Sequence, residues 1–151
     1  MRARRFAVLI GFAGAALWAP VASAAVPVTT ITIQVTFGVT DEPFTTTGGV
    51  VCASGIAVTD PVFVAGFGRG GRGVGTFHLV KTMTCDNGDT FKILVDAAAS
   101  PNSGGTVGGF AAGQGTGGLT GVHGGGSLVG TAFPDFSGLT DVYTGRLTIA
   151  P

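Results

Sequence analysis

Charged side chains are scarce in this sequence. Asp, Glu, Lys and Arg make up 11% of the 151 residues, with eight acidic and eight basic residues in total. Three of the basic residues, Arg2, Arg4 and Arg5, stand at the very start, so the chain after residue 24 carries a formal charge of −3. Nucleic acids and anionic membrane surfaces are bound through a concentrated basic face. We therefore expect neither as a partner.

Long hydrophobic runs are also missing, with one short exception. The apolar stretch from Phe6 to Trp18 is too short to span a membrane comfortably, and no second stretch follows. It lies between the three arginines and the small residues Ala22–Ala24, which is the pattern of a cleaved signal peptide over 1–24. We expect a protein without a membrane span that is exported to the extracellular space or the cell envelope. The 127 residues from 25 to 151 are enough for one domain.

Cysteine is nearly absent, with only Cys52 and Cys85. Two cysteines in a chain bound for an oxidising compartment predict one disulfide. The alternative is a pair of free thiols or metal ligands, but no Cys-x-x-Cys motif or neighbouring histidine supports it.

The signals of metal and cofactor sites are incomplete. Two histidines, His78 and His123, lack a convincing third ligand. The acidic turn Asp86–Asp89 lacks the further oxygen ligands and the terminal Glu of a calcium loop. The segment Gly113–Gly118 matches a dinucleotide fingerprint formally, but no helix is predicted after it. We expect no metal and no cofactor.

The best-defined local structure is a β-hairpin over Gly75–Ala99. Asp86, Asn87 and Gly88 separate two runs rich in Thr, Val, Ile and Phe, which is a strong hairpin signal. A three-residue loop with Gly88 in the left-handed conformation puts the apolar residues of both runs on one face. The apolar face then holds Phe77, Leu79, Met83, Cys85, Phe91, Ile93, Val95 and Ala97, with Lys81 as the exception.

Further strands are predicted along the chain, and no stretch after residue 24 has helical periodicity. Thr30–Val39 alternates as a half-buried strand, Asp41–Gly49 is interpreted as a connection, and Val50–Thr59 as an irregular strand. From residue 104 to 130, thirteen of 27 residues are glycine, yet apolar residues recur there in pieces of strand length. Leu139–Ile149 alternates as a closing strand. The fold class is therefore all-β, a single antiparallel β-barrel of about eight strands, with a β-sandwich as the alternative.

Four segments carry a family resemblance. They are CASG (Cys52–Gly55), FHLVKTMTCDNGDTFKI (Phe77–Ile93), GTGGLTGVHGGGSLVGT (Gly115–Thr131) and TDVYTGRL (Thr140–Leu147). Together they resemble a group of small exported actinobacterial proteins, and the glycine segment is similar to that of the allene oxide cyclase and dirigent proteins. The resemblance implies an eight-stranded antiparallel barrel that encloses a small apolar cavity, with the two cysteines bonded. Leu119 stands where those families usually carry an aromatic residue.

Two residue pairs are candidate sites. Asp141 and Tyr143 alternate with Val142, so they point the same way as Leu139 and Leu147. Inside a barrel, burial would raise the pKa of the Asp141 carboxyl, and Tyr143 would serve either as a hydrogen-bond donor in catalysis or simply as the partner of a buried acid. The second, weaker pair is His78 and Asp96, which face each other across the hairpin as a proton acceptor with its carboxylate or as a pair on the outer wall.

Three functions follow as hypotheses. The first is a noncatalytic module that binds a small apolar ligand inside the barrel. The second is a cyclase or isomerase of the allene oxide cyclase or dirigent type, with Asp141 as the acid and Tyr143 as the donor. The third is a structural or cell-envelope interaction protein with a solidly packed interior.

Overall fold

The computed structural model describes residues 25–60, 63–65, 75–100 and 104–151. The predicted signal peptide, 1–24, lies outside the described residues. The described chain is built from β-strands and one short 3₁₀ helix, η1. The elements are β1 (Val28–Thr36), β2 (Asp41–Thr47), β3 (Ser54–Thr59), β4 (Phe63–Ala65), β5 (Gly75–Cys85), β6 (Thr90–Ser100), β7 (Gly105–Gly113), η1 (Gly117–Leu119), β8 (Val122–Ala132) and β9 (Gly138–Ile149).

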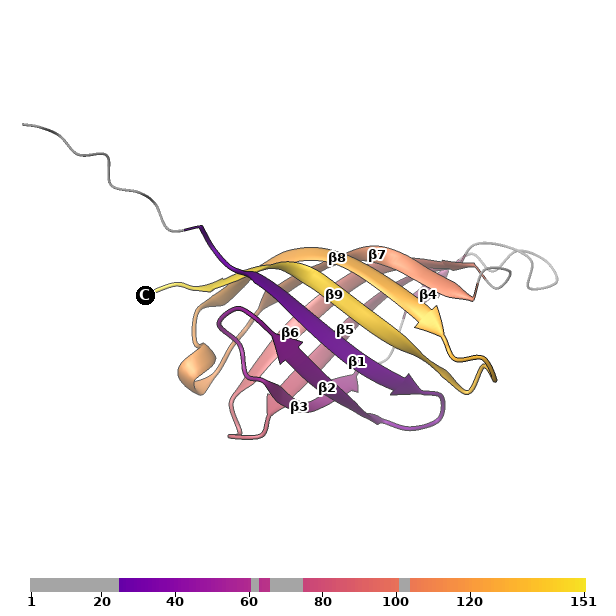
Figure 1. The fold of residues 1–151 in the computed structure, drawn as a ribbon, viewed down its shortest axis with the longest axis horizontal. Helices are drawn as coiled ribbons and strands as arrows, with labels where there is room; N and C mark the ends of the chain where they lie inside the picture. The colour runs from indigo at the N-terminus through magenta and orange to yellow at the C-terminus, as the bar shows by residue number, and fades with distance from the viewer. Residues whose placement is uncertain (1–24, 61–62, 66–74, 101–103) are drawn as a thin grey trace, which may run out of the picture.

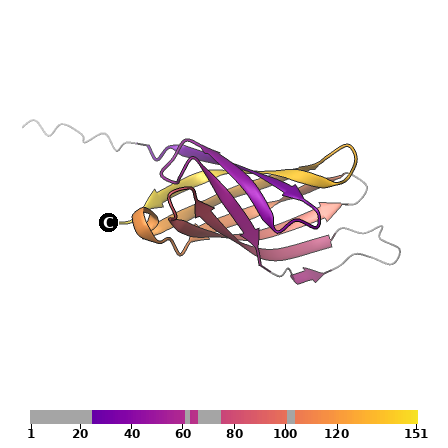
Figure 2. The same cartoon turned by 90° about the horizontal axis from the view of Figure 1, so that it is seen from below.

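The strands close into an antiparallel barrel (Figures 1 and 2). The sheet order is β3-β2-β1-β9-β8-β7-β6-β5-β4, and β3 also pairs with β5, which joins the two sides of the sheet. Because β3 pairs with residues 81–85 of β5 and β4 with residues 76–78, these two short strands occupy one position in the barrel. The result is a closed eight-stranded barrel, as predicted, and not a sandwich.

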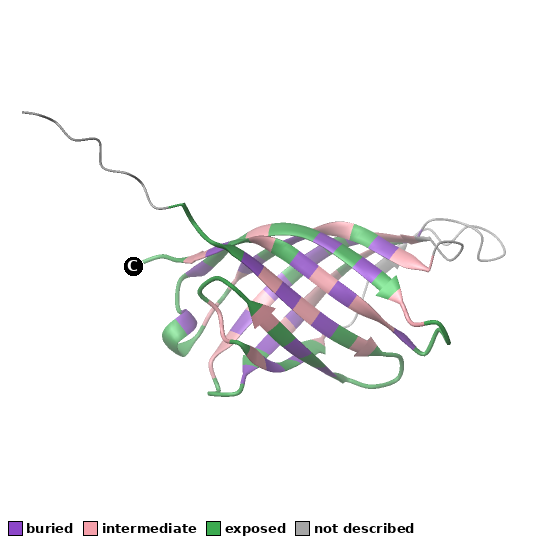
Figure 3. Ribbon diagram, viewed as in Figure 1, coloured by how far each residue is buried: buried purple, intermediate pink, exposed green. Residues whose placement is uncertain are grey.

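Buried and more exposed residues alternate along most of the strands (Figure 3), because successive side chains of a strand point to opposite faces of the sheet. Inward residues such as Ile31, Phe91 and Leu147 are fully buried, and they form one core cluster. Leu119 of η1 also belongs to this cluster and is buried, so η1 covers one end of the barrel. We call this the η1 end. The β1–β2 turn and the β8–β9 connection lie at the opposite end (Figure 1).

The central hairpin has the predicted register. His78 pairs with Asp96 and Met83 with Phe91, which puts the predicted apolar residues on the inner face. Gly88 has a φ of 88°, the left-handed conformation that the three-residue loop requires. Thus local alternation and turn chemistry were sufficient to set the register of β5 and β6.

The segment interpreted as a connection, Asp41–Gly49, is instead largely a strand. Residues 41–47 form β2 between β1 and β3, with Glu42 and Phe44 pointing inward and buried. Pro43 is tolerated because the β1–β2 pairing ends at Phe44, so no β1 residue is paired with Pro43. The three threonines after Phe44 are residues that favour strands.

Two other strand limits differ from the prediction. β1 ends at Thr36, because the chain turns at Gly38, whose φ is 84°. Phe37 and Val39 are consequently 61% and 52% exposed and do not belong to the buried face. β3 begins only at Ser54, and the residues before it approach the end of β5, where a disulfide joins Cys52 to Cys85 with a Cα–Cα distance of 5.9 Å. The predicted disulfide is therefore present.

Candidate functional site

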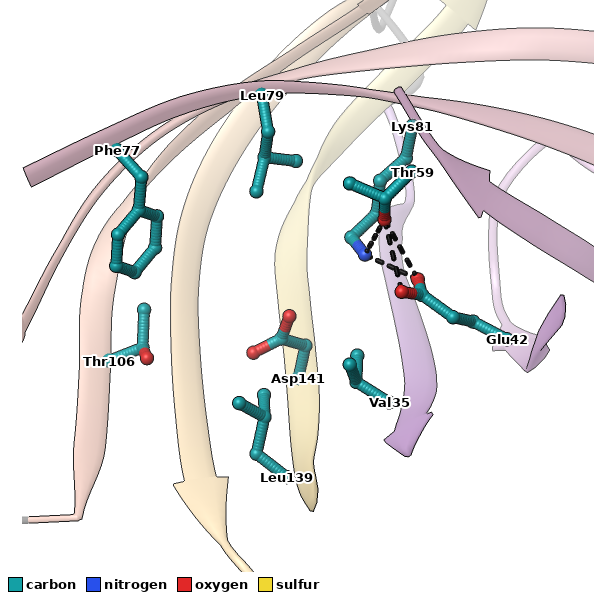
Figure 4. Close-up of a pocket in the computed structure, with 9 residues that line it drawn as sticks. All are labelled: Val35, Glu42, Thr59, Phe77, Leu79, Lys81, Thr106, Leu139 and Asp141. Atoms are coloured by element: carbon teal, nitrogen blue, oxygen red, sulfur yellow. Dashed lines mark hydrogen bonds and ion pairs between the residues drawn. The ribbon is translucent and has the colours of Figure 1, made fainter. Parts of the chain in front are cut away.

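A pocket of about 230 Å³ lies inside the barrel at the end opposite η1 (Figure 4). Its wall comes from strand residues near that end, such as Val35 just before the end of β1 and Leu139 just after the start of β9. We call it the end pocket. Its apolar lining residues are Val35, Phe77, Leu79 and Leu139, and its polar lining residues are Glu42, Thr59, Lys81, Thr106 and Asp141.

Asp141 points into the barrel from β9, on the same side of the strand as Tyr143 and Leu147, as the alternation predicted. Its side chain is 7% exposed and lines the end pocket, while Tyr143 is fully buried. The Tyr143 hydroxyl donates to Asp141 Oδ2 at 3.3 Å, but Oδ1 is buried and has no hydrogen-bond partner among the described residues. Figure 4 places this carboxylate among the lining side chains, with Glu42 and Lys81 on one side and Phe77 and Thr106 on the other.

The environment of this pair shifts both acid–base equilibria. Burial raises the pKa of the Asp141 carboxyl to about 6, and the charge of Lys81 and the hydrogen bond from Tyr143 lower it by smaller amounts. Burial also raises the pKa of the Tyr143 hydroxyl far above its ordinary range, and the neighbouring Asp141 carboxylate raises it further. Tyr143 therefore stays protonated and donates to Asp141.

A glycine on the neighbouring strand leaves room for this carboxylate. Gly130 on β8 is the cross-strand partner of both Asp141 and Thr106. A Cβ atom at Gly130 would lie 2.5 Å from Asp141 Oδ1 and 2.9 Å from the Thr106 Cβ. The absence of a side chain at this position of the glycine-rich segment thus keeps space beside the unpartnered oxygen.

A buried ion pair forms another part of the pocket wall. Lys81 Nζ contacts Glu42 Oε2 and donates to Thr59 Oγ1 at 2.7 Å, and the Thr59 hydroxyl lies 3.0 Å from Glu42 Oε1. Lys81 and Glu42 are only 2% and 5% exposed. Sequence reasoning found Lys81 as an exception on the apolar face but missed Glu42, because its segment was interpreted as a connection.

The weaker candidate pair lies elsewhere. His78 and Asp96 pair across β5 and β6 as predicted, and His78 Nδ1 contacts Asp96 Oδ1, but their side chains are 62% and 78% exposed. The pair is thus on the outer wall, and neither residue lines the end pocket. His123 contacts Thr148 and the Gly121 carbonyl. Among the described residues, no three His, Cys, Asp or Glu side chains are grouped to hold a metal ion.

The buried carboxyl of Asp141 makes stability depend on pH. The folded protein binds the proton of Asp141 more tightly than the unfolded chain does, so protonation of this carboxyl stabilises the fold. This stabilisation is complete below about pH 4 and is lost as the pH rises through about 6. A shift of this size corresponds to roughly 3 kcal/mol. We expect urea unfolding from pH 4 to 8 to show Asp141→Asn gaining about that much stability relative to wild type.

Asp60→Asn, which alters an exposed carboxyl, is the control. Its free energy of unfolding should depend on pH between 4 and 8 in the same way as that of the wild type. If the free energies of unfolding of the wild type and Asp141→Asn change in parallel with pH, the folded protein does not bind the proton preferentially at this site.

The fold and the site define the class of protein: a closed eight-stranded antiparallel β-barrel with one disulfide and a pocket of mixed polarity at one end. Comparisons with protein-family models, curated proteins and solved structures give no match for this chain. The relationship to the allene oxide cyclase and dirigent proteins therefore stays a prediction. No helix in the described part of the chain has the length and apolar character needed to cross a membrane.

Proposed function

We propose that this barrel binds a small, largely apolar molecule in the end pocket. The observation that carries the proposal is the contrast between the two halves of the interior. Toward the η1 end, side chains such as Phe91 and Leu147 are completely buried and packed. At the other end, Val35, Phe77 and Leu79 line a space and remain partly accessible, although they belong to the edge of the same core.

The volume of the end pocket limits the size of the ligand. An apolar cavity of about 150 Å³ holds benzene, so about 230 Å³ accommodates a six-membered ring with a short substituent. This is smaller than the roughly 300–1,000 Å³ of most drug-sized sites. The proposed ligand is accordingly a small molecule rather than a long acyl chain.

Binding without catalysis is favoured over the cyclase or isomerase alternative. In that alternative, Asp141 acts as the acid and Tyr143 as a donor to the substrate. Tyr143 already donates to Asp141, however, and is not among the residues that line the end pocket. This leaves Asp141 without the second catalytic group that the alternative requires. A purely structural role would not require a pocket at all.

Export remains part of the proposal. A disulfide between Cys52 and Cys85 is stable in an oxidising compartment, which is compatible with secretion or with the cell envelope.

Toluene is a suitable probe, because it is apolar and of the right size. We expect isothermal titration calorimetry to detect toluene binding to the wild type, and Leu139→Phe to weaken it by about tenfold or more by filling the end pocket. Leu94→Phe is the matched control, since Leu94 is 47% exposed on the outer face. It should bind toluene like the wild type. Absence of toluene binding, or equal binding by Leu139→Phe with an unchanged circular dichroism spectrum, would contradict the proposal.

A further inference from the structure

We propose that the molecule bound in the end pocket is a small apolar amine, whose ammonium group donates a hydrogen bond to Asp141 Oδ1. This inference rests on the proposed function and adds the chemical class of the ligand. It is drawn from the unpartnered oxygen, the charges that surround it and the apolar wall opposite.

One carboxylate oxygen of Asp141 is left unsatisfied. More than nine-tenths of the Asp141 surface is buried, and Oδ2 accepts from Tyr143 while Oδ1 accepts from no group in the part of the chain that the structure describes. A buried acceptor without a donor carries the full cost of its desolvation, and the cost is largest for a charged group. Oδ1 has less than 1 Å² of accessible surface, so a donor on a bound molecule reaches it through a small shift of the Asp141 side chain toward the end pocket, which this residue lines. A ligand that only accepts hydrogen bonds would leave the oxygen unsatisfied.

The charge of the site also favours a cationic ligand. Lys81 from β5 and Glu42 from β2 form an ion pair, so their charges cancel. Tyr143, on the same strand as Asp141, is neutral. Among the described residues, the titratable groups of the site thus sum to one negative charge when Asp141 is ionised, which a monovalent cation neutralises. The described residues that the other strands contribute to the site do not ionise: Val35 from β1, Thr59 from β3, Thr106 from β7 and Gly130 from β8.

The cation already present at the site, Lys81, pairs with Glu42 and not with Asp141. Lys81 Nζ is held by Glu42 and Thr59, and its hydrogen bonds go to these two residues rather than to Asp141. The protein therefore places the Lys81 ammonium group against the Glu42 carboxylate. The Asp141 carboxylate receives no such group from the described residues. Phe77 and Leu79 provide an apolar surface for the rest of the ligand. A small ring bearing a short aminomethyl group satisfies both requirements.

Three probes of similar size separate the possible ligands. Benzylamine carries an ammonium, benzyl alcohol has a neutral donor, and toluene has no donor. At pH 7.5 we expect benzylamine to bind the wild type roughly tenfold to a hundredfold more tightly than benzyl alcohol, because both donate to the same carboxylate but only the ammonium also neutralises its charge. In Asp141→Asn this preference should disappear while toluene binding is retained. At pH 5, where Asp141 is protonated, the preference should also fall in the wild type.

The outcomes distinguish this inference from the proposed function. If toluene binds but benzylamine binds no better than benzyl alcohol, or if the benzylamine preference survives in Asp141→Asn, the ligand is not an amine held by Asp141, and the binding barrel still stands. If none of the three probes binds a folded wild-type protein, both proposals are wrong. Toluene binding to Asp141→Asn shows that the variant has kept its pocket.

Discussion

Replacing both Cys52 and Cys85 with alanine is expected to lower the free energy of unfolding by about 4 kcal/mol. The disulfide spans 33 residues and links the segment before β3 to the end of β5. In the chain-entropy model, closing a loop of this length destabilises the unfolded chain by about that amount. Since domains of this kind are stable by only about 5–15 kcal/mol, the loss would be a large fraction of the total. Urea unfolding at pH 7 measures it.

The reduced wild type is the control for this prediction. Cys85 is buried in the core and Cys52 packs against it, so the alanine variant also loses some packing. The reduced wild type keeps both sulfur atoms and loses only the covalent link. We expect the reduced wild type and the double variant to agree within about 1 kcal/mol. If oxidised and reduced wild type unfold at the same urea concentration, the disulfide does not stabilise the barrel.

Much of the fold could be predicted from local patterns. The β5–β6 hairpin has its predicted register because the turn residues and the alternation both lie within the hairpin. The inward position of Asp141 and Tyr143 likewise follows from alternation along a single strand, β9. The glycine-rich segment was recognised as strands by the spacing of its apolar residues, and β7 and β8 are formed there.

The parts of the fold and of the site that could not be predicted depend on contacts between distant parts of the chain. Glu42 and Lys81 are 39 residues apart, and they meet because β3 pairs with both β2 and β5. No local pattern specifies that pairing, which is also what closes the barrel. The run of Pro43 and three threonines was ambiguous between a strand and a connection, and only its neighbours β1 and β3 resolve it. A cavity was expected from the family resemblance, but the polar wall of the end pocket was missed for the same reason, since that wall forms only when the barrel closes.

Lys81→Met is expected to lower the free energy of unfolding by about 3–5 kcal/mol, the usual cost of removing one partner of a buried ion pair. The Glu42 carboxylate would remain 5% exposed in the wild-type arrangement, with the Thr59 hydroxyl as its donor but no compensating charge. Removing the charge of Lys81 should also change the properties of the end pocket. The charge of Lys81 lowers the pKa of Asp141, so its removal should move that pKa above about 6.

Replacing both partners separates the charge effect from the loss of packing. We expect Glu42→Met/Lys81→Met to lie within about 1 kcal/mol of the wild type or above it, because two apolar side chains of similar volume leave no buried charge. A double-mutant cycle built from urea unfolding of the wild type, both single variants and the double variant gives the coupling energy. If the two single losses simply add in the double variant, the pair is not coupled. Lys81 would then owe its buried position to packing alone, and the charge balance argued for the end pocket would not hold.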